Sequence, residues 1–573
     1  MAKKKLRSQE WFGGSDYYGL ARRGWLRSEG YSHDIFDGRP VIGICNSWSE
    51  LNNCNMHLRT VAEAVKRGVW AAGGLPLEFP TISLGEMYMR PTTMLYRNLM
   101  AMDVEESIRA NPIDGVVLLC GCDKTTPAQL MGCASADVPA IVVPGGPMLS
   151  GQWRGQRVGS GTDGRKIFDL FRSGKLSEEK WQELEGCISR SAGHCTVMGT
   201  ASTMTSLAEA LGMTLTGCAN IPAPDSRRLA IAEKSGRRIV EMVAEDLRPS
   251  QIMTREALEN AIIVDMAIGG STNAVVHLLA IAGRLGIRLH LDDFDAISRQ
   301  TPYIANVKPS GAYLMEDFFY AGGLPSIMRE LLPKLHGDCI TVTGKSIREN
   351  VENAECFNRE VIRSLTEPLH PEGGTIVLRG NLAPDGAVLK QTAASQRLLQ
   401  HRGPAYVFES NDEMLAQIDR EDLPVTKDSV LVLKNCGPKG APGFPEWGHI
   451  PLPKVLLTQG VDDVVRISDA RMSGTSFGTI VLHVAPESAI GGPLALVKTG
   501  DVIELNAEAR SLTLCVDDEE LARRRAAFVP PVPKYERGYG WLFLQHVTQA
   551  NLGCDFDFLP ARSARPAICD ENF

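Results

Sequence analysis

One run of the chain, Asp114-Gly-Val-Val-Leu-Leu-Cys120-Gly-Cys-Asp-Lys-Thr-Thr-Pro127, passes directly from apolar residues to closely spaced polar ones. A short, continuous apolar run of this kind is typical of a parallel strand buried on both faces. The thiol, carboxylate and amine of Cys122, Asp123 and Lys124 follow at its carboxyl end, where open α/β sheets bind ligands. The run therefore predicts a parallel sheet with a candidate site at its carboxyl edge.

The same pattern recurs on both sides of this run. Apolar segments at residues 40–46 and 138–143 each break at a polar, glycine or proline turn. Helices are predicted at residues 57–72, 203–211 and 274–285. Because strands that alternate with helices form layered α/β domains, we expect residues 1–374 to form such a domain.

The character of the sequence changes after Pro371-Glu-Gly-Gly374. Long helices become fewer, and short strands are predicted at residues 375–379, 405–408, 429–434, 461–467, 479–483 and 502–505. Closely spaced short strands are typical of a barrel or sandwich. The predicted fold class is α/β, with an N-terminal layered domain and a β-rich, barrel-like domain over residues 375–573.

Length and charge limit the classes of protein. A chain of 573 residues exceeds what one hydrophobic core usually supports, in agreement with two domains. The net charge of −8 argues against a nucleic-acid-binding protein, which would present a basic face. No apolar signal-peptide region follows the basic N-terminus, and no apolar run is long enough to span a bilayer. We therefore expect a cytoplasmic protein without a nucleic-acid or membrane partner.

The 14 cysteines show no regular close spacing. A disulfide framework is not expected in a large chain of this kind, and zinc is poorly supported because there is no C-x-x-C pair. Six cysteines lie in apolar or helical contexts and are predicted to be small core residues: Cys45, Cys187, Cys218, Cys339, Cys356 and Cys515.

Two motifs resemble nucleotide-binding loops but lack the required context. Gly159-Ser-Gly-Thr-Asp-Gly164 follows a polar segment instead of the buried strand that a dinucleotide-binding fingerprint needs. Gly344-Lys-Ser346 lacks the first glycine of a phosphate-binding loop, since Cys339 occupies that position. Both are predicted to be ordinary turns.

Five further segments combine a strand end or loop with side chains that bind metals or substrates. They are Glu50-Leu-Asn-Asn-Cys-Asn-Met-His57, Ser83-Leu-Gly-Glu-Met-Tyr-Met-Arg-Pro91, Ser191-Ala-Gly-His-Cys-Thr-Val-Met-Gly199, Cys436-Gly-Pro-Lys-Gly-Ala-Pro-Gly-Phe-Pro-Glu446 and Ser468-Asp-Ala-Arg-Met-Ser-Gly-Thr475. Glycine lets the backbone of such loops approach a ligand closely. Any one of them alone would be read as a turn.

Together with Gly269-Gly-Ser-Thr-Asn273 and Arg379-Gly-Asn-Leu-Ala-Pro384, these segments resemble the dihydroxy-acid and 6-phosphogluconate dehydratase family over nearly the whole chain. The Gly121–Pro127 and Arg90–Thr92 segments look most like the pentonate branch, such as arabinonate dehydratase. The resemblance implies a hydro-lyase that converts a sugar acid or a related 2,3-dihydroxy acid to the 2-keto-3-deoxy acid. It also implies a homodimer or homotetramer, with the active site between the two domains.

The resemblance implies that Cys54, Cys122 and Cys195 hold an iron–sulfur cluster, a [2Fe–2S] or, as the alternative, a [4Fe–4S] cluster. Three thiolates would leave one iron open to act as a Lewis acid toward the C3 hydroxyl, which is a poor leaving group. Cys120 and Cys133 are nearby spare thiols, but the motif points to Cys122.

The same resemblance assigns Mg²⁺ to Glu86, Asp123, Glu446 and a carbamylated Lys124, since magnesium prefers oxygen ligands. The alternative for Lys124 is a simple salt bridge with Asp123. A cation at the carboxylate end would stabilise the ene-diolate that forms when the C2 proton leaves.

The base that removes the C2 proton matches Ser473, whose hydroxyl needs activation. His57 and His194 flank cluster cysteines and are expected to be hydrogen-bonded structural or substrate-contact residues.

Three other functions remain open at this point. The first is dehydration of a branched-chain dihydroxy acid, whose alkyl groups require an apolar pocket instead of hydrogen-bond partners for hydroxyl groups. The second is an iron–sulfur electron carrier or sensor, in which Glu86, Asp123, Lys124 and Glu446 would have no role. A carbohydrate-binding module is weaker still, because the chain has few aromatic clusters that could stack on sugars.

Overall fold

The computed structural model describes residues 6–561, and its N-terminal half contains a parallel four-stranded sheet. The strand order is β2-β1-β3-β4, and neighbouring strands run parallel. Their bounds are Val41–Asn46 (β1), Leu75–Pro80 (β2), Gly115–Cys120 (β3) and Ala140–Pro144 (β4). Every residue of β1, β3 and β4 is buried, as expected of strands covered on both faces.

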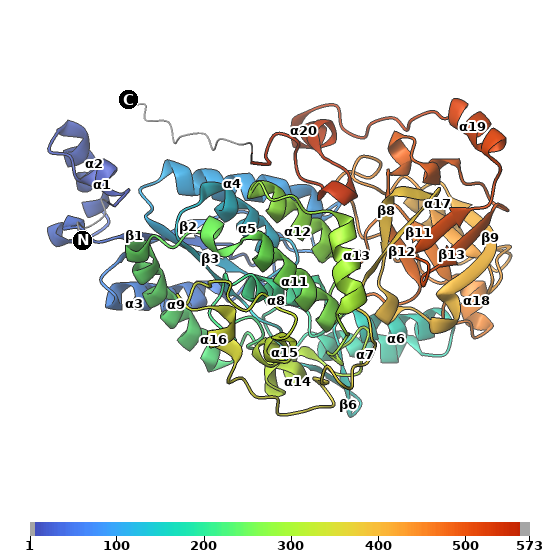
Figure 1. Ribbon diagram of the computed structural model, residues 1–573, viewed down its shortest axis with the longest axis horizontal. Helices are drawn as coiled ribbons and strands as arrows, with labels where there is room; N and C mark the ends of the chain where they lie inside the picture. Colours follow the sequence, from blue (N-terminus) through green and yellow to red (C-terminus); the bar gives the residue numbers. More distant parts are fainter. Residues whose placement is uncertain (1–5, 562–573) are drawn as a thin grey trace.

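Helices pack on both faces of this sheet (Figure 1). Helices α3 (Leu58–Ala71) and α9 (Ser226–Glu245) pack against each other on one face. Helices α4 (Arg97–Ala110) and α5 (Thr125–Ala136) form the corresponding pair on the other face. The buried helices α8 (Thr200–Ala210), α11 (Arg255–Ile268) and α12 (Asn273–Arg284) add a further layer.

Eight strands of the C-terminal half close into a barrel, in the order β10-β11-β12-β8-β7-β14-β13-β9. They are Ile376–Gly380 (β7), Ala383–Leu389 (β8), Gln400–Phe408 (β9), Val430–Leu433 (β10), Val465–Ser468 (β11), Ile480–Ala485 (β12), Val502–Asn506 (β13) and Ser511–Leu514 (β14). Strands β9 to β12 pair in parallel, whereas β8 and β13 pair antiparallel with their neighbours. The barrel confirms the predicted fold class; the division between residues 374 and 375 stays a prediction.

The two halves meet in one hydrophobic cluster, although the barrel also has a core of its own. Val377, Val388 and Leu482 of the barrel pack in the same buried cluster as the helices and strands of the N-terminal half. The chain then returns to the N-terminal half, where Arg284 of α12 forms a buried ion pair with Asp555 at 2.6 Å. Because burial of unpaired charge is costly, this contact helps to hold the halves in one arrangement.

Of the two segments that resemble nucleotide-binding motifs, Gly344–Ser346 is a turn, as predicted, whereas Gly159–Gly164 is a turn only over its first three residues, because helix α6 (Thr162–Arg172) begins at Thr162. Gly159–Gly164 follows β6 (Gln156–Val158), the second strand of a two-stranded antiparallel ribbon with β5 (Gly151–Trp153). Ser346 caps the short helix α16 (Ile347–Val351) through its own side chain. Among the described residues, no helix is both long and apolar enough to cross a membrane.

Candidate active site

The predicted ligands follow the carboxyl ends of three neighbouring parallel strands. Cys54 lies in the loop after β1, Glu86 in the loop after β2, and Cys122 directly after β3. Because β2, β1 and β3 are adjacent in the sheet, their following loops meet at one edge. Residues that are far apart in the sequence therefore lie close together in space.

Three carboxylates at this edge could hold a metal ion. Glu86, Asp123 and Glu446 each offer an oxygen, and these oxygens lie within 4.8 Å of one another. Each side chain is largely buried, with 24%, 14% and 14% of its area exposed, respectively. Thr93 also donates a hydrogen bond to Glu86. Like charges at such spacing repel unless a cation lies between them.

In this structure Lys124 supplies that positive charge. Its amine lies 3.0 Å from Glu86, 3.1 Å from Glu446 and 3.4 Å from Asp123, and its side chain is fully buried. Burial disfavours the charged amine, but the Glu446 and Glu86 carboxylates outweigh it and raise the pKa of Lys124 above its ordinary value. Conversely, burial raises the pKa of Asp123, and Lys124 opposes that rise only in part.

Two residues without a predicted role hold Glu446 in place. Arg471 lies 2.9 Å from the Glu446 carboxylate and is fully buried. The Asn273 amide lies 3.0 Å from the same carboxylate. Although burial works against it, the positive charges of Lys124 and Arg471 keep the pKa of Glu446 low. Both residues lie inside motifs visible in the sequence, which gave no sign of this contact.

Cys54 and Cys122 come together because their loops touch. A side chain on Gly121 would place its Cβ 2.9 Å from the Cys54 carbonyl oxygen, so only glycine fits between them. The neighbouring Cys122 thiol, together with burial and the charge of Cys195, raises the pKa of Cys54 well above its ordinary value. The thiols of Cys54, Cys122 and Cys195 thus lie close enough to interact electrostatically.

Cys195 reaches the same place through backbone pairing. His194 forms a bridge with Pro147 in the segment after β4, and the His194 N–H donates to the Gly146 carbonyl at 3.0 Å. The Gly193 N–H donates to the Asn53 carbonyl at 3.2 Å, next to Cys54. Burial and the charge of Asp123 raise the pKa of Cys195 to about 12. The structure therefore brings all three predicted cluster ligands together.

The spare thiols face other surroundings. Cys120 is fully buried within β3, and burial raises its pKa to about 12. Cys133 is buried on α5, where its thiol contacts the Leu130 carbonyl oxygen at 3.3 Å. Their contacts fit core residues.

Ser473 lies in the loop between strands β11 and β12 of the barrel. Its hydroxyl lies 3.0 Å from the Thr475 hydroxyl. The preceding carbonyl, that of Met472, accepts from the Asn273 amide at 3.1 Å, and this amide also contacts Glu446. The serine loop is therefore tied to the carboxylate group through Asn273.

The two histidines near the cysteines are hydrogen-bonded and neutral. The His57 Nε2 lies 2.9 Å from the Gly145 carbonyl oxygen, and the His194 Nδ1 lies 3.2 Å from that of Cys195. Burial lowers the pKa of His57 to about 4 and that of His194 to about 3. Neither imidazole carries charge at neutral pH.

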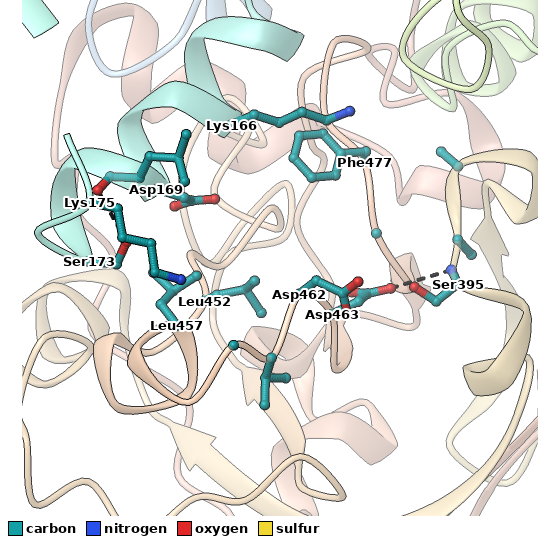
Figure 2. Close-up of a pocket in the computed structure, with 16 residues that line it drawn as sticks. Lys166, Asp169, Ser173, Lys175, Ser395, Leu452, Leu457, Asp462, Asp463 and Phe477 are labelled. Atoms are coloured by element: carbon teal, nitrogen blue, oxygen red, sulfur yellow. Dashed lines mark hydrogen bonds between the residues drawn. The ribbon is translucent and has the colours of Figure 1, made fainter. Parts of the chain in front are cut away.

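A cavity of about 440 Å³ lies beside the site, between α6 (Thr162–Arg172) and the barrel. Figure 2 shows Lys166, Asp169 and Phe477 on its wall, with Asp463 hydrogen-bonded to the backbone N–H of Ser395. None of the predicted ligands lines it. It adjoins the serine loop through Phe477.

Comparison with known proteins agrees with this geometry. The chain matches the dihydroxy-acid/6-phosphogluconate dehydratase N-terminal model over residues 39–350 and the C-terminal model over residues 360–554. It is 56% identical to L-arabinonate dehydratase of Rhizobium leguminosarum bv. trifolii, over 97% of this chain and 96% of the relative.

Two further relatives also align over nearly their whole length. The chain is 52% identical to 6-deoxy-6-sulfo-D-gluconate dehydratase of Pseudomonas putida, over 98% of both chains. It is 40% identical to dihydroxy-acid dehydratase of Caldicellulosiruptor bescii, over 93% of this chain and 97% of the relative. The chain therefore belongs to the dihydroxy-acid/6-phosphogluconate dehydratase family, whose members are hydro-lyases.

Proposed function

We propose that this protein dehydrates a polyhydroxy sugar acid to the corresponding 2-keto-3-deoxy acid. One observation carries the proposal: three thiols converge beside a group of three carboxylates at the seam between the sheet and the barrel. The relatives named for arabinonate and sulfogluconate are 56% and 52% identical to the chain, against 40% for the branched-chain type. A sugar acid therefore fits better than a branched-chain acid.

The donor set fits the two groups that the family pattern implies. Cys54, Cys122 and Cys195 would hold the [2Fe–2S] cluster, since thiolates are its usual ligands. When bound, a cluster with three protein thiolates supplies an open iron that polarises the C3 hydroxyl for departure. A [4Fe–4S] cluster is the alternative.

Glu86, Asp123 and Glu446 would hold Mg²⁺, which neutralises the charge that develops on the substrate carboxylate and C2 oxygen. The Lys124 amine lies between these carboxylates, where a cation would lie. Carbamylation would turn this amine into a further oxygen ligand and remove its repulsion of the metal.

Ser473 acts as the base that accepts the C2 proton. Its hydroxyl is half-buried, contacts Thr475 and sits on the loop held by Asn273. A serine needs a neighbouring positive charge or base to serve in this way. The buried Arg471, two residues before Ser473 in the chain and 2.9 Å from Glu446, would supply positive charge to this loop.

The proposal is tested by incubating the anaerobically purified protein with L-arabinonate, D-xylonate, D-gluconate and 2,3-dihydroxyisovalerate and measuring 2-keto acid release. We expect the highest kcat/KM for one of the three aldonates. A preference for 2,3-dihydroxyisovalerate would instead favour the branched-chain reaction, and release from none of the acids would contradict dehydration of either class.

A further inference from the structure

Helix α6 (Thr162–Arg172) packs its first turn directly on the serine loop. The Thr162 hydroxyl donates to the Thr475 carbonyl at 2.7 Å. A Cβ on Gly161 would lie 2.5 Å from the Thr475 hydroxyl, so the helix begins in contact with this loop. Arg165 follows Thr162 by three positions and therefore projects from the same face of the helix.

The Arg165 side chain is unpaired within residues 6–561, the part of the chain that the structure describes. Its Nε is shielded from solvent and without a hydrogen bond, and no hydrogen bond or ion pair joins its guanidinium to another described residue. Arginine carries five N–H donors, and a shielded donor without an acceptor costs about 1–3 kcal/mol. A group that carries oxygen atoms and is absent from the chain itself would remove this cost.

Arg165 lies within electrostatic reach of the candidate site. Burial lowers the pKa of Arg165, and the charges of Glu446, Cys195 and Asp169 oppose this change. Burial and the charge of Arg165 in turn lower the pKa of His449, whose shielded ring nitrogen, Nδ1, has no partner in the described part of the chain. Arg165 and His449 are thus two neighbouring polar groups without partners among the described residues.

We propose that Arg165, with His449 beside it, binds the hydroxylated tail of the substrate beyond C3 and so selects sugar acids. This inference rests on the proposed function. There the carboxylate and C2 lie at Glu86, Asp123 and Glu446, and C3 lies at the cysteines. Arg165 forms no ion pair with Glu446 at the carboxylate end, and it stands on the helix that contacts Thr475; we therefore place the carbons beyond C3 nearest to it.

The planar guanidinium group of arginine can donate two parallel hydrogen bonds, and two neighbouring hydroxyl oxygens can accept them. A substrate whose tail is a pair of methyl groups would leave the guanidinium without acceptors and would be penalised. Arg165 is thus a specificity-determining residue, and it takes no part in the removal of the proton or of the hydroxide.

The test compares Arg165→Met with the matched control Lys166→Met. Lys166 is the next residue on α6, but it is exposed and lies over the Phe477 ring at 5.0 Å, on the cavity side shown in Figure 2. For L-arabinonate and D-gluconate, we expect kcat/KM to fall ~10- to 100-fold in Arg165→Met, mainly through KM. For 2,3-dihydroxyisovalerate, as substrate or as competitive inhibitor, we expect no loss. Lys166→Met should match the parent protein.

A second measurement does not depend on turnover. Calorimetric titration with a 3-deoxypentonate, which keeps the tail but lacks the leaving hydroxyl, should show ~10- to 100-fold weaker binding to Arg165→Met at unchanged iron content. Arg165→Lys keeps the positive charge but loses the planar pair of N–H donors, so its affinity for this ligand should lie between those of the parent protein and Arg165→Met.

An equal loss on all acids, including 2,3-dihydroxyisovalerate, would place Arg165 at the carboxylate end or in the framework and overturn the inference. Unchanged kinetics on the aldonates would overturn it as well. If the parent protein converts the aldonates, either result leaves the proposed function intact; if the parent protein converts none of the acids, the proposed function itself fails.

Discussion

Glu446 illustrates how single residues gain their properties from distant partners. Its carboxylate contacts Lys124, Asn273 and Arg471, which come from three separate parts of the chain. A carboxylate surrounded by such donors stays ionised although it is buried. It is therefore ready to bind a cation without first losing a proton.

At the scale of one residue, Ser473 is the part of the proposed mechanism that one substitution can separate from the proposed cofactor binding. Ser473→Ala should keep the iron content and visible colour but lose ~10²- to 10⁴-fold in kcat, because only the proton acceptor is removed. Iron analysis and a keto-acid assay on the same preparation check this.

The matched control is Ser476→Ala in the same loop. The Ser476 hydroxyl is buried and has no hydrogen-bond partner among the residues that the structure describes, so its loss should leave kcat near that of the parent protein. Normal turnover in Ser473→Ala would refute the assigned base.

The family resemblance carried by the motifs predicted which side chains would cluster, whereas each motif alone would have been read as a turn. The structure brings Glu86, Asp123, Lys124 and Glu446 together and places the three cysteines beside them. The roles of Arg471, Asn273 and Arg165 were not predictable, because arginine and asparagine are common surface residues. Only their burial and partners in the folded chain set them apart.

At the scale of strands and helices, continuous apolar runs predicted β1, β3 and β4 well, whereas β2, β8 and β14 were missed. Leu75-Pro-Leu-Glu-Phe-Pro80 contains two prolines and a glutamate, and it forms an edge strand, where proline is tolerated. Strand β8 contains Pro384, Asp385 and Gly386, which are turn residues by local preference. Pairing with neighbouring strands overrides local preference in these cases.

A buried pair of charges connects helix α11 to the end of strand β8. Burial raises the pKa of Asp265 to about 8, and the Lys390 charge opposes this rise. Burial likewise lowers the pKa of Lys390 to about 8, opposed by Asp265. Neither side chain has a hydrogen-bond partner within the part of the chain that the structure describes. The two groups thus affect each other's pKa across the boundary between the helical layer and the barrel without a hydrogen bond.

Lys390→Met should make stability more sensitive to alkali. Without the amine, the pKa of Asp265 rises further, so the folded state binds the proton more tightly than the unfolded state. Stability is then lost as the pH rises toward this pKa, by up to about 1.4 kcal/mol per pH unit. Melting temperatures between pH 7 and pH 9 should fall more steeply in this variant than in the parent protein.

The control for that experiment is Asp265→Asn/Lys390→Met, which has no titrating group at this position. Its melting temperature should lack the additional decline. If Lys390→Met and the parent protein showed equal slopes, the two side chains would not be coupled across the interface.

At the scale of the whole molecule, the site exists only because the two halves stay in one arrangement. Glu446 and Ser473 come from the C-terminal half, and the cysteines and other carboxylates come from the N-terminal half. The shared hydrophobic cluster and the Arg284–Asp555 pair fix that arrangement. Periodicity and composition predicted two kinds of architecture, but they contain no information on how the halves dock, because docking depends on side chains far apart in sequence.

The most direct test of the account is the iron and acid-labile sulfide content, with the visible spectrum, of anaerobically purified Cys122→Ser and Cys120→Ser. The two residues are two positions apart in the sequence. The Cys122 thiol raises the pKa of Cys54, whereas Cys120 lies inside strand β3. We predict that Cys122→Ser loses colour, iron and turnover together, while Cys120→Ser keeps all three. A Cys122→Ser protein with full colour and iron would contradict the account.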